Sequence, residues 1–329
     1  CDTGFGHRLA KRLAENGFRV YAGCLSSVSD GACVLNLVPN VHVLQLDVTK
    51  EDEIDEAYKE IINADYQTAW RLCLVQFCFI AHDLSLLART TARRVSANAA
   101  LWAVVANAGV MTVGPLEWHC MDQVRALFDV NVFGVTRVVV KFLPLLRKTG
   151  GRIVIVSSMF GRMTGAFTIP YCMTKHACIS LADGLRRRFY GTKLRVITIE
   201  PTAYRTALSD PEEIKRRMDE LVASLPPEAK KDIDPARVSK VRAMARVFVE
   251  GLLRDDPDEV VSDMVLAVRE EYPKAHYRTG GTADAVVRFL NHLLPSETAD
   301  YVLASVAKSN GVCKKVKDST EVYAKEDSI

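Results

Sequence analysis

The sequence has few of the features that indicate a metal-binding or nucleic-acid-binding protein. It contains nine cysteines, but it has no Cys-x-x-Cys spacing and no histidine cluster that would form a metal site. The formal net charge of +3 is small and the basic residues are scattered, which excludes an extended nucleic-acid footprint. Because the cysteines show no paired spacing, we interpret them as reduced thiols in an intracellular protein.

A long hydrophobic run is also missing. The most apolar stretch, from Leu72 to Ala88, is shorter than the roughly 20 residues of a membrane-spanning helix and contains His82 and Asp83. It lies in a segment, residues 63–100, that is far longer than the ~2–6 residues usual for connections in α/β units. We interpret this segment as an atypical insertion that derives from a retained intron or a faulty gene model. The alternative is a membrane-surface hairpin, followed by basic residues from Arg89 to Arg94.

Apolar strand patterns alternate with helical patterns along the rest of the chain. The predicted strands are 18–25, 41–48, 101–106, 152–158 and 194–200, with a short one at 276–280. Further helical patterns follow at 211–223, 237–252 and 258–270. Such alternation predicts an α/β fold with a doubly wound, Rossmann-like parallel sheet. We expect one domain over 1–307 and a polar, disordered tail over 308–329.

The sequence Tyr171-x-x-x-Lys175 places a phenol and an ammonium on one face of a predicted helix. A phenol titrates near ~10, and a neighbouring ammonium favours its charged form. The pair is therefore suited to exchange a proton with an alcohol or carbonyl oxygen, although this spacing alone is more often a solvated helix face. Ser158 ends a buried strand 13 positions earlier and brings a hydroxyl to the same edge of the sheet. Asn131 lies in the long helix before that strand.

These motifs, in this order, resemble the short-chain dehydrogenase/reductase family over nearly the whole chain. The family's other motifs in this sequence are CDTGFG (1–6), DVT (47–49), NAG (107–109) and EPTAYRT (200–206). The longer stretches CDTGFGHRLAKRLAENGFRVYAGCL (1–25) and YPKAHYRTGG (272–281) look most like the branch of retinol, 17-beta-hydroxysteroid and D-beta-hydroxybutyrate dehydrogenases. The resemblance implies that Tyr171 is the general acid/base and that Lys175 lowers its pKa and contacts the ribose. It also implies that Ser158 orients the substrate oxygen and that Asn131 holds a water of the proton relay.

The resemblance further implies a dinucleotide site. The residues expected to contact the cofactor are Gly4, Phe5, Gly6, Asp47, Val48, Asn107, Ala108, Gly109, Tyr171, Lys175, Pro201 and Thr206. Thr3 and Leu25 stand where a 2′-phosphate would require Arg or Lys, so NAD is expected rather than NADP. The acid that usually binds the ribose is missing as well, because Cys24 is near its place. Thr202 replaces the glycine of the family's Pro-Gly.

The strand that feeds the glycine turn would precede Cys1, so we expect the first strand of the fold to be missing and any N-terminal signal region to be absent. Residues from about 205 to 270 are expected to form the helical substrate-side extension.

The implied activity is NAD(P)-dependent interconversion of an alcohol and a carbonyl. The substrate is a steroid, a retinoid or a 3-hydroxy acid such as 3-hydroxybutyrate. The alternative functions are a catalytically silent nucleotide-binding or scaffold protein, or a fragment from a faulty gene model. The family also implies a homo-oligomer and leaves open association with a mitochondrial or endoplasmic reticulum membrane.

Overall fold

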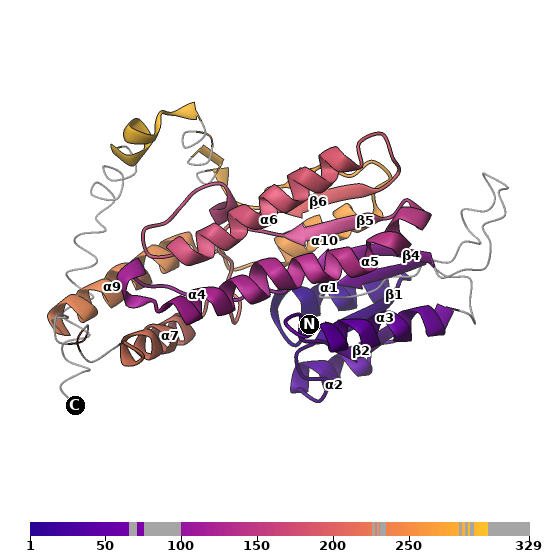
Figure 1. Ribbon diagram of the computed structural model, residues 1–329, viewed down its shortest axis with the longest axis horizontal. Coiled ribbons are helices and arrows are strands. Elements are labelled where there is room, and N and C mark those ends of the chain that lie inside the picture. Colours follow the sequence, from indigo (N-terminus) through magenta and orange to yellow (C-terminus); the bar gives the residue numbers. More distant parts are fainter. Residues whose placement is uncertain are drawn as a thin grey trace.

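The computed structural model describes residues 1–65, 71–75, 100–225, 228, 230, 235–282, 285, 286, 289 and 293–301. Within them lies a seven-stranded parallel sheet with helices on both faces (Figure 1). The predicted tail over 308–329 and most of the segment 63–100 lie outside the described residues.

The strands follow the order β2-β1-β3-β4-β5-β6-β7 across the sheet. Their bounds are β1 Arg19–Cys24, β2 Val41–Gln45, β3 Arg71–Val75, β4 Ala100–Ala106, β5 Arg152–Val156, β6 Arg195–Ile199 and β7 His276–Tyr277. Six of these strands fall on the six predicted segments, so the predicted doubly wound α/β fold is confirmed. The pattern was readable because strands buried on both faces are continuous apolar runs.

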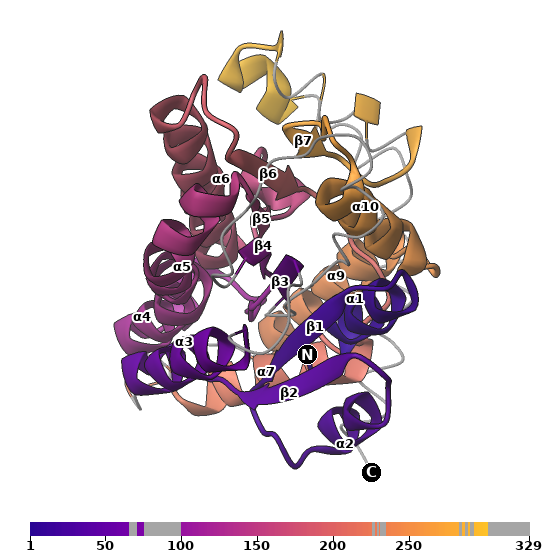
Figure 2. The same ribbon diagram turned by 90° about the vertical axis from the view of Figure 1, so that its right-hand side faces the viewer.

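Figure 2 shows the two helical layers on either side of the sheet. One layer holds α3 (Glu51–Asp65), α5 (Val135–Thr149) and α6 (Ile169–Arg188), and the other holds α1 (Gly4–Glu15), α2 (Asp30–Asn36) and α10 (Asp258–Arg269). Alternate residues of β5 serve the two cores, with Ile153 and Ile155 in the cluster below α5 and α6. Val154 and Val156 pack in the cluster below α1 and α10. The period of two that defines a strand thus joins both layers through one element.

The row of the sheet that the first strand of the fold would occupy is filled in this structure by β3. β3, which comes from the segment 63–100, pairs in parallel with β1 on one side and with β4 on the other. Its last residue, Val75, lies opposite Ala22, and the amino group of Cys1 donates to the carbonyl of the next residue, Gly23. Residues 71–75 and Cys1 therefore follow one another along the same edge of β1. Both neighbouring strands thus have a hydrogen-bonded partner in this row, as buried backbone groups require.

The helices of the expected substrate-side extension, residues 205–270, pack in two different parts of the molecule. α7 (Pro211–Ala223) and α9 (Pro235–Leu252) contribute to a separate apolar cluster that includes the buried Trp118. Trp118 is the last residue of η1 (Leu116–Trp118), the short helix before α4 (Met121–Phe128). α10 instead packs against α1 and against β5 and β6. Only α7 and α9 of this interval form a lobe beside the carboxyl ends of the strands, where ligands bind in open α/β folds.

Candidate active site

Tyr171 and Lys175 lie one turn apart near the start of α6, and both are buried. The Lys175 Nζ lies 5.6 Å from the centre of the Tyr171 ring and donates a hydrogen bond to the carbonyl of Val156 at 3.1 Å. That carbonyl is the last of β5, so the ammonium is fixed between the helix and the end of the strand. The four-residue spacing places both groups on one side of the helix, as the sequence predicted.

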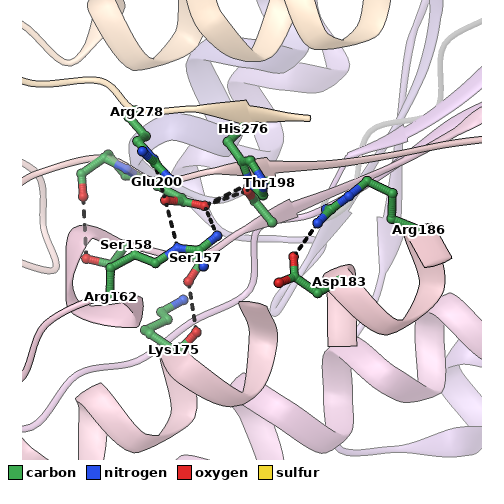
Figure 3. A network of polar contacts seen from close by, with 11 residues as sticks. Ser157, Ser158, Arg162, Lys175, Asp183, Arg186, Thr198, Glu200, His276 and Arg278 are labelled. Carbon is green, nitrogen blue, oxygen red and sulfur yellow. Dashed lines mark hydrogen bonds and ion pairs between the residues drawn. The ribbon is translucent and has the colours of Figure 1, made fainter. Parts of the chain in front are cut away.

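Ser158 follows β5 and faces the same cavity as Tyr171. Its Oγ accepts from the amide of Phe160 at 3.2 Å and donates to the carbonyl of Pro201 at 3.4 Å. The second contact is long for an O–H···O bond, so it is weak and the hydroxyl can turn to another acceptor. Ser157 points to α6 instead, where its Oγ donates to the carbonyl of Lys175 at 3.0 Å (Figure 3).

Asn131 is fully buried in a π-helical turn, η2 (Asp129–Gly134), between α4 and α5. Its amide accepts from the backbone N–H of Val110 at 2.8 Å and donates to the carbonyl of Val110 and to the hydroxyl of Thr174, at 2.9 and 3.0 Å. The side chain thus ties the loop after β4 to α6. Single π turns inside helices often occur at functional sites, because they direct one side chain inward.

The loop after β4 carries Asn107, Ala108 and Gly109 and reaches Lys175 and Asn131. A Cβ on Gly109 would lie 3.3 Å from the Lys175 Nζ and 3.6 Å from the Asn131 Oδ1. Gly109 therefore allows the backbone to approach these two polar groups closely.

The start of α1 has the form of a phosphate-binding turn. Gly4 adopts a positive φ of 67°, Thr3 caps the helix without a side-chain hydrogen bond, and the first turn has no acidic side chain. A Cβ on Gly6 would lie 3.0 Å from the Asn107 Nδ2. The backbone N–H groups of a helix start favour an anion, and glycine lets a pyrophosphate approach them. These residues fit a dinucleotide cofactor.

One cavity joins most of the predicted residues at the carboxyl ends of the strands. Its lining includes Gly4, Phe5, Asn107, Gly109, Ser158, Tyr171, Lys175, Pro201 and Thr206. Gly6, Ala108 and Asn131 are buried beside this lining, and Asp47 and Val48 lie beyond β2. The Asp47 carboxylate accepts from the amide and hydroxyl of Thr49, whereas Val48 packs against Gly134.

Sequence reasoning missed several residues of this lining. They are Met111, Val156, Ser157, Thr168, Ala203, Tyr204, Ala207, Leu208 and Ser209. Tyr204 is a second phenol in the cavity, but its hydroxyl donates to Glu259 at 2.7 Å. Burial and the Glu259 carboxylate raise the pKa of Tyr204, so this phenol stays protonated and does not compete with Tyr171 as an acid–base group.

Thr202 occupies the position at which the sequence lacks the family's glycine. The loop is nevertheless well tied, because the Thr202 amide donates to the carbonyl of Thr279 at 3.0 Å and the Met159 amide donates to that of Pro201 at 2.8 Å. The buried Thr202 Oγ1 has no hydrogen-bond partner in the described structure. A buried unpaired hydroxyl beside a cavity is a group that a bound ligand can satisfy.

Behind the cavity, Glu200 is completely buried at the end of β6 (Figure 3). Its carboxylate accepts from Arg162 at 3.0 Å, from the hydroxyl of Thr198 at 2.8 Å and from Arg278 at 3.3 Å. The His276 Nδ1 lies 3.1 Å away. Burial raises the pKa of Glu200, but hydrogen bonds from His276, Arg162 and Thr198 outweigh it and lower the pKa to about 2. The ionised carboxylate therefore connects β6, β7 and the η3 turn (Met159–Gly161) that follows Ser158.

Neither a metal centre nor a membrane span is found in the part of the chain that the structure describes. No group of three or more His, Cys, Asp or Glu side chains there could hold a metal ion. None of the described helices combines the length and the apolar character needed to cross a bilayer.

A glycine turn at the start of a helix, on a doubly wound parallel sheet, defines a dinucleotide-binding α/β protein. The family model "short chain dehydrogenase" matches residues 1–73 and 71–217, more than half of the sequence. The chain belongs to the short-chain dehydrogenase family.

Curated relatives include hydroxy-acid and steroid dehydrogenases. The chain is 33% identical to the mitochondrial D-beta-hydroxybutyrate dehydrogenase of Bos taurus over 213 residues, which are 64% of this chain and 54% of that protein. It is 28% identical to the human 17-beta-hydroxysteroid dehydrogenase type 6 over 306 residues, covering 92% of this chain and 85% of the relative. The matched region spans 54% to 61% of the length of the three hydroxybutyrate dehydrogenases.

Solved structures agree on the fold. A short-chain dehydrogenase/reductase from Burkholderia phymatum in complex with NAD superposes with a TM-score of 0.62 at 18% identity, covering 88% of this chain and 90% of that one. A short-chain dehydrogenase from Streptomyces avermitilis gives a TM-score of 0.60 at 22% identity and covers 95% and 94%.

Proposed function

We propose that the protein is an NAD-dependent oxidoreductase that interconverts a secondary alcohol and a ketone. The observation that carries this proposal is the position of Tyr171, Lys175 and Ser158 on one cavity that also includes the glycine turn at the start of α1. A scaffold protein would have no need to bury an ammonium beside a phenol at the end of a strand, because burying a charge is costly unless it has a role.

In this proposal Tyr171 exchanges the proton of the substrate hydroxyl. The Lys175 Nζ lies beside the Tyr171 ring, and the Ser158 hydroxyl turns from Pro201 to the substrate oxygen. Together, Tyr171 and Ser158 stabilise the charge that develops on that oxygen. Asn131 is proposed to hold a water of the proton relay. The chemistry that bound NAD supplies is acceptance or donation of a hydride at the carbinol carbon.

The residues proposed to hold the cofactor come from four strand ends. Gly4, Phe5 and Gly6 receive the pyrophosphate, and Lys175 contacts the nicotinamide ribose. The other proposed contacts are Asp47, Val48, Asn107, Ala108, Gly109, Tyr171, Pro201 and Thr206. The positive φ of Gly4 and the uncapped N-terminus of α1 support this assignment.

The cavity lining favours a lipophilic, uncharged alcohol over a short hydroxy acid. Met111, Phe160 and Leu208 supply apolar surface, and Lys175 is the one charged residue among the described residues of this lining. A substrate carboxylate would need a cation of its own. Arg217, in an adjoining hollow, is already paired with Glu213 at 2.9 Å. A steroid or retinoid therefore fits better than 3-hydroxybutyrate.

The test is Tyr171→Phe, which removes the exchangeable proton and keeps the ring. We expect turnover of a steroid or retinoid alcohol with NAD to fall by about 100-fold or more, as removal of a general acid–base group does. Binding of NAD, followed by fluorescence quenching, should be unchanged. Substantial turnover by the variant would refute the role of Tyr171, and NAD binding without any turnover by the wild-type protein would favour a silent nucleotide-binding protein.

Self-association, membrane association and an intracellular location remain predictions. The names of the D-beta-hydroxybutyrate dehydrogenases place those relatives in mitochondria. Sedimentation of the purified protein would measure its oligomeric state.

A further inference from the structure

The end of β1 lacks the acidic residue that dinucleotide-binding proteins use to recognise a ribose. In such folds an Asp or Glu about 20 residues beyond the glycines accepts a hydrogen bond from the ribose 2′-hydroxyl and thereby selects NAD. Here β1 ends at Cys24, which is fully buried, and the next residue, Leu25, is exposed. Neither side chain can accept a hydrogen bond from a sugar hydroxyl in the way that a carboxylate does.

A carboxylate reaches the end of β1 from another part of the chain. The Asp2 Oδ2 accepts from the backbone N–H of Leu25 at 2.9 Å, and its Oδ1 accepts from the hydroxyl of Ser29. Ser29 is the N-cap of α2, the helix that follows β1. Asp2 is therefore hydrogen-bonded to the residue that directly follows Cys24, the place of the missing acid, and lies two positions before the glycine turn.

The Asp2 carboxylate is both charged and accessible to a ligand. Its side chain is 27% exposed, so a ligand can reach the carboxylate beside the hydrogen bonds from Leu25 and Ser29. Burial raises the pKa of Asp2, but the bonds from Ser29 and Leu25 and the amino group of Cys1 outweigh it and lower the pKa. The group is negative at neutral pH.

Neither of the two sequence positions at which a basic side chain would hold a 2′-phosphate carries one. Thr3 and Leu25, which flank the Asp2 carboxylate along the chain and across the hydrogen bond, are both uncharged. A phosphate at this position would face a fixed negative charge at close range, whereas a hydroxyl would gain a charge-assisted hydrogen bond.

We propose that Asp2 is the specificity-determining residue of the cofactor site, which accepts the adenosine 2′-hydroxyl of NAD and excludes the 2′-phosphate of NADP. This inference rests on the proposed function, since it assumes that the glycine turn holds a dinucleotide. In this proposal the selectivity for NAD over NADP comes from Asp2, beside the glycine turn, because the end of β1 has no acidic residue to provide it.

The test compares dissociation constants for NAD and NADP by calorimetry on the purified chain. Asp2→Asn keeps the size of the side chain and removes the charge, so the preference for NAD should fall by roughly 10- to 100-fold, the range expected for a charge-assisted hydrogen bond. Asp30→Asn is the matched control, because it removes an equal charge from an exposed position at the start of α2. Its preference should equal that of the wild type.

A second probe changes the ligand and leaves the wild-type protein intact. NAD that lacks the adenosine 2′-hydroxyl should bind the wild type at least about tenfold more weakly than NAD. An unchanged NAD-to-NADP ratio in folded Asp2→Asn, or equal binding of the deoxy ligand, would overturn the role of Asp2 while leaving the proposed function in place. Failure of the wild type to bind either dinucleotide would instead refute the proposed function.

Discussion

Glu200 combines complete burial with a full negative charge. Carboxylates that are removed from water stay ionised only when donors surround them, and here Arg162, Thr198, His276 and Arg278 all approach the same group. Because Arg162 follows the η3 turn beside Ser158, the carboxylate also holds the loop that positions the Ser158 hydroxyl. Its removal should affect stability first and turnover second.

We predict that Glu200→Gln lowers the free energy of unfolding by about 3 kcal/mol at pH 7, because several donors then lose their charged acceptor. The pKa of Glu200 is about 2 in the folded protein and ordinarily 4.5. The lowered pKa means that this stability is fully present above pH 4.5 and is lost as the pH falls toward 2. Urea unfolding of both proteins at several pH values measures the difference.

The exposed Glu15 on α1 provides the control for Glu200, because Glu15→Gln removes a charge without burying an unpaired donor. Its effect should stay within about 0.5 kcal/mol at every pH. A wild-type advantage over Glu200→Gln that did not change between pH 6 and pH 3 would contradict the assigned role of the charge.

The sequence predicted those residues of the site whose positions follow from local patterns, such as helical spacing or the end of a strand. Tyr171 and Lys175 follow from helical spacing, and Ser158 follows from its place at the end of an apolar strand. Tyr204 and Asp2 were not predicted, because their positions depend on how distant segments return to the sheet. Asp2 meets Leu25 across a hydrogen bond between different elements, which no local spacing reveals.

At the scale of elements, the η3 turn packs so closely on α6 that one position requires glycine. A Cβ on Gly161 would lie 2.7 Å from the Ser157 Oγ and 2.8 Å from the carbonyl of Lys175. The second atom belongs to the backbone of the catalytic helix and cannot move away without shifting that helix. The distance between Ser158 and Tyr171 is therefore fixed by the contact of two elements.

Gly161→Ala should separate η3 from α6, lower stability by about 1–3 kcal/mol and reduce turnover. The matched control is Gly184→Ala in α6, the helix against which η3 packs, because an added Cβ at Gly184 meets nothing within 4 Å. That change should raise stability by roughly 0.5–1 kcal/mol, because glycine is unfavourable inside a helix. Thermal unfolding and steady-state kinetics of both variants decide the matter, and equal effects of the two would contradict the packing argument.

Element boundaries were predicted well where amphipathic patterns are strong. The pattern at 211–223 coincides with α7, and those at 237–252 and 258–270 differ from α9 and α10 by one or two residues. β3 was missed because four of its five residues lie within a longer apolar run, Leu72 to Ala88, that has no strand-like boundary. Whether such a run joins a sheet depends on a vacant row, which is a property of the whole fold.

At the scale of the molecule, β3 is the only strand in the described structure that joins the β1–β2 pair to strands β4–β7 by hydrogen bonds. Proline has no N–H and cannot pair within a central strand. Leu74→Pro should therefore destabilise the protein by about 3 kcal/mol or more and weaken NAD binding. Circular dichroism during urea titration and NAD fluorescence measure the two effects.

β2 provides a control strand, because it lies at the edge and pairs with β1 alone. The amide of Leu46 donates to Cys24, and in the alternating pattern of a parallel ladder the N–H of Val43 points away from β1. Val43→Pro should cost clearly less than Leu74→Pro. Equal losses, or a Leu74→Pro protein of wild-type stability, would show that β3 does not hold the sheet together.

The π turn around Asn131 has a consequence for how this protein can change by mutation. α4, η2 and α5 follow one another without a break, so the wide turn amounts to one additional residue in a continuous helical run. Deleting one residue there would close the wide turn into a regular α-helical turn, and Val138 and Phe142 of α5 would stay on the side of the sheet. The inward position of the Asn131 amide thus depends on one additional residue in the run, so a single-codon deletion would remove the wide turn while leaving the packing of α5 largely in place.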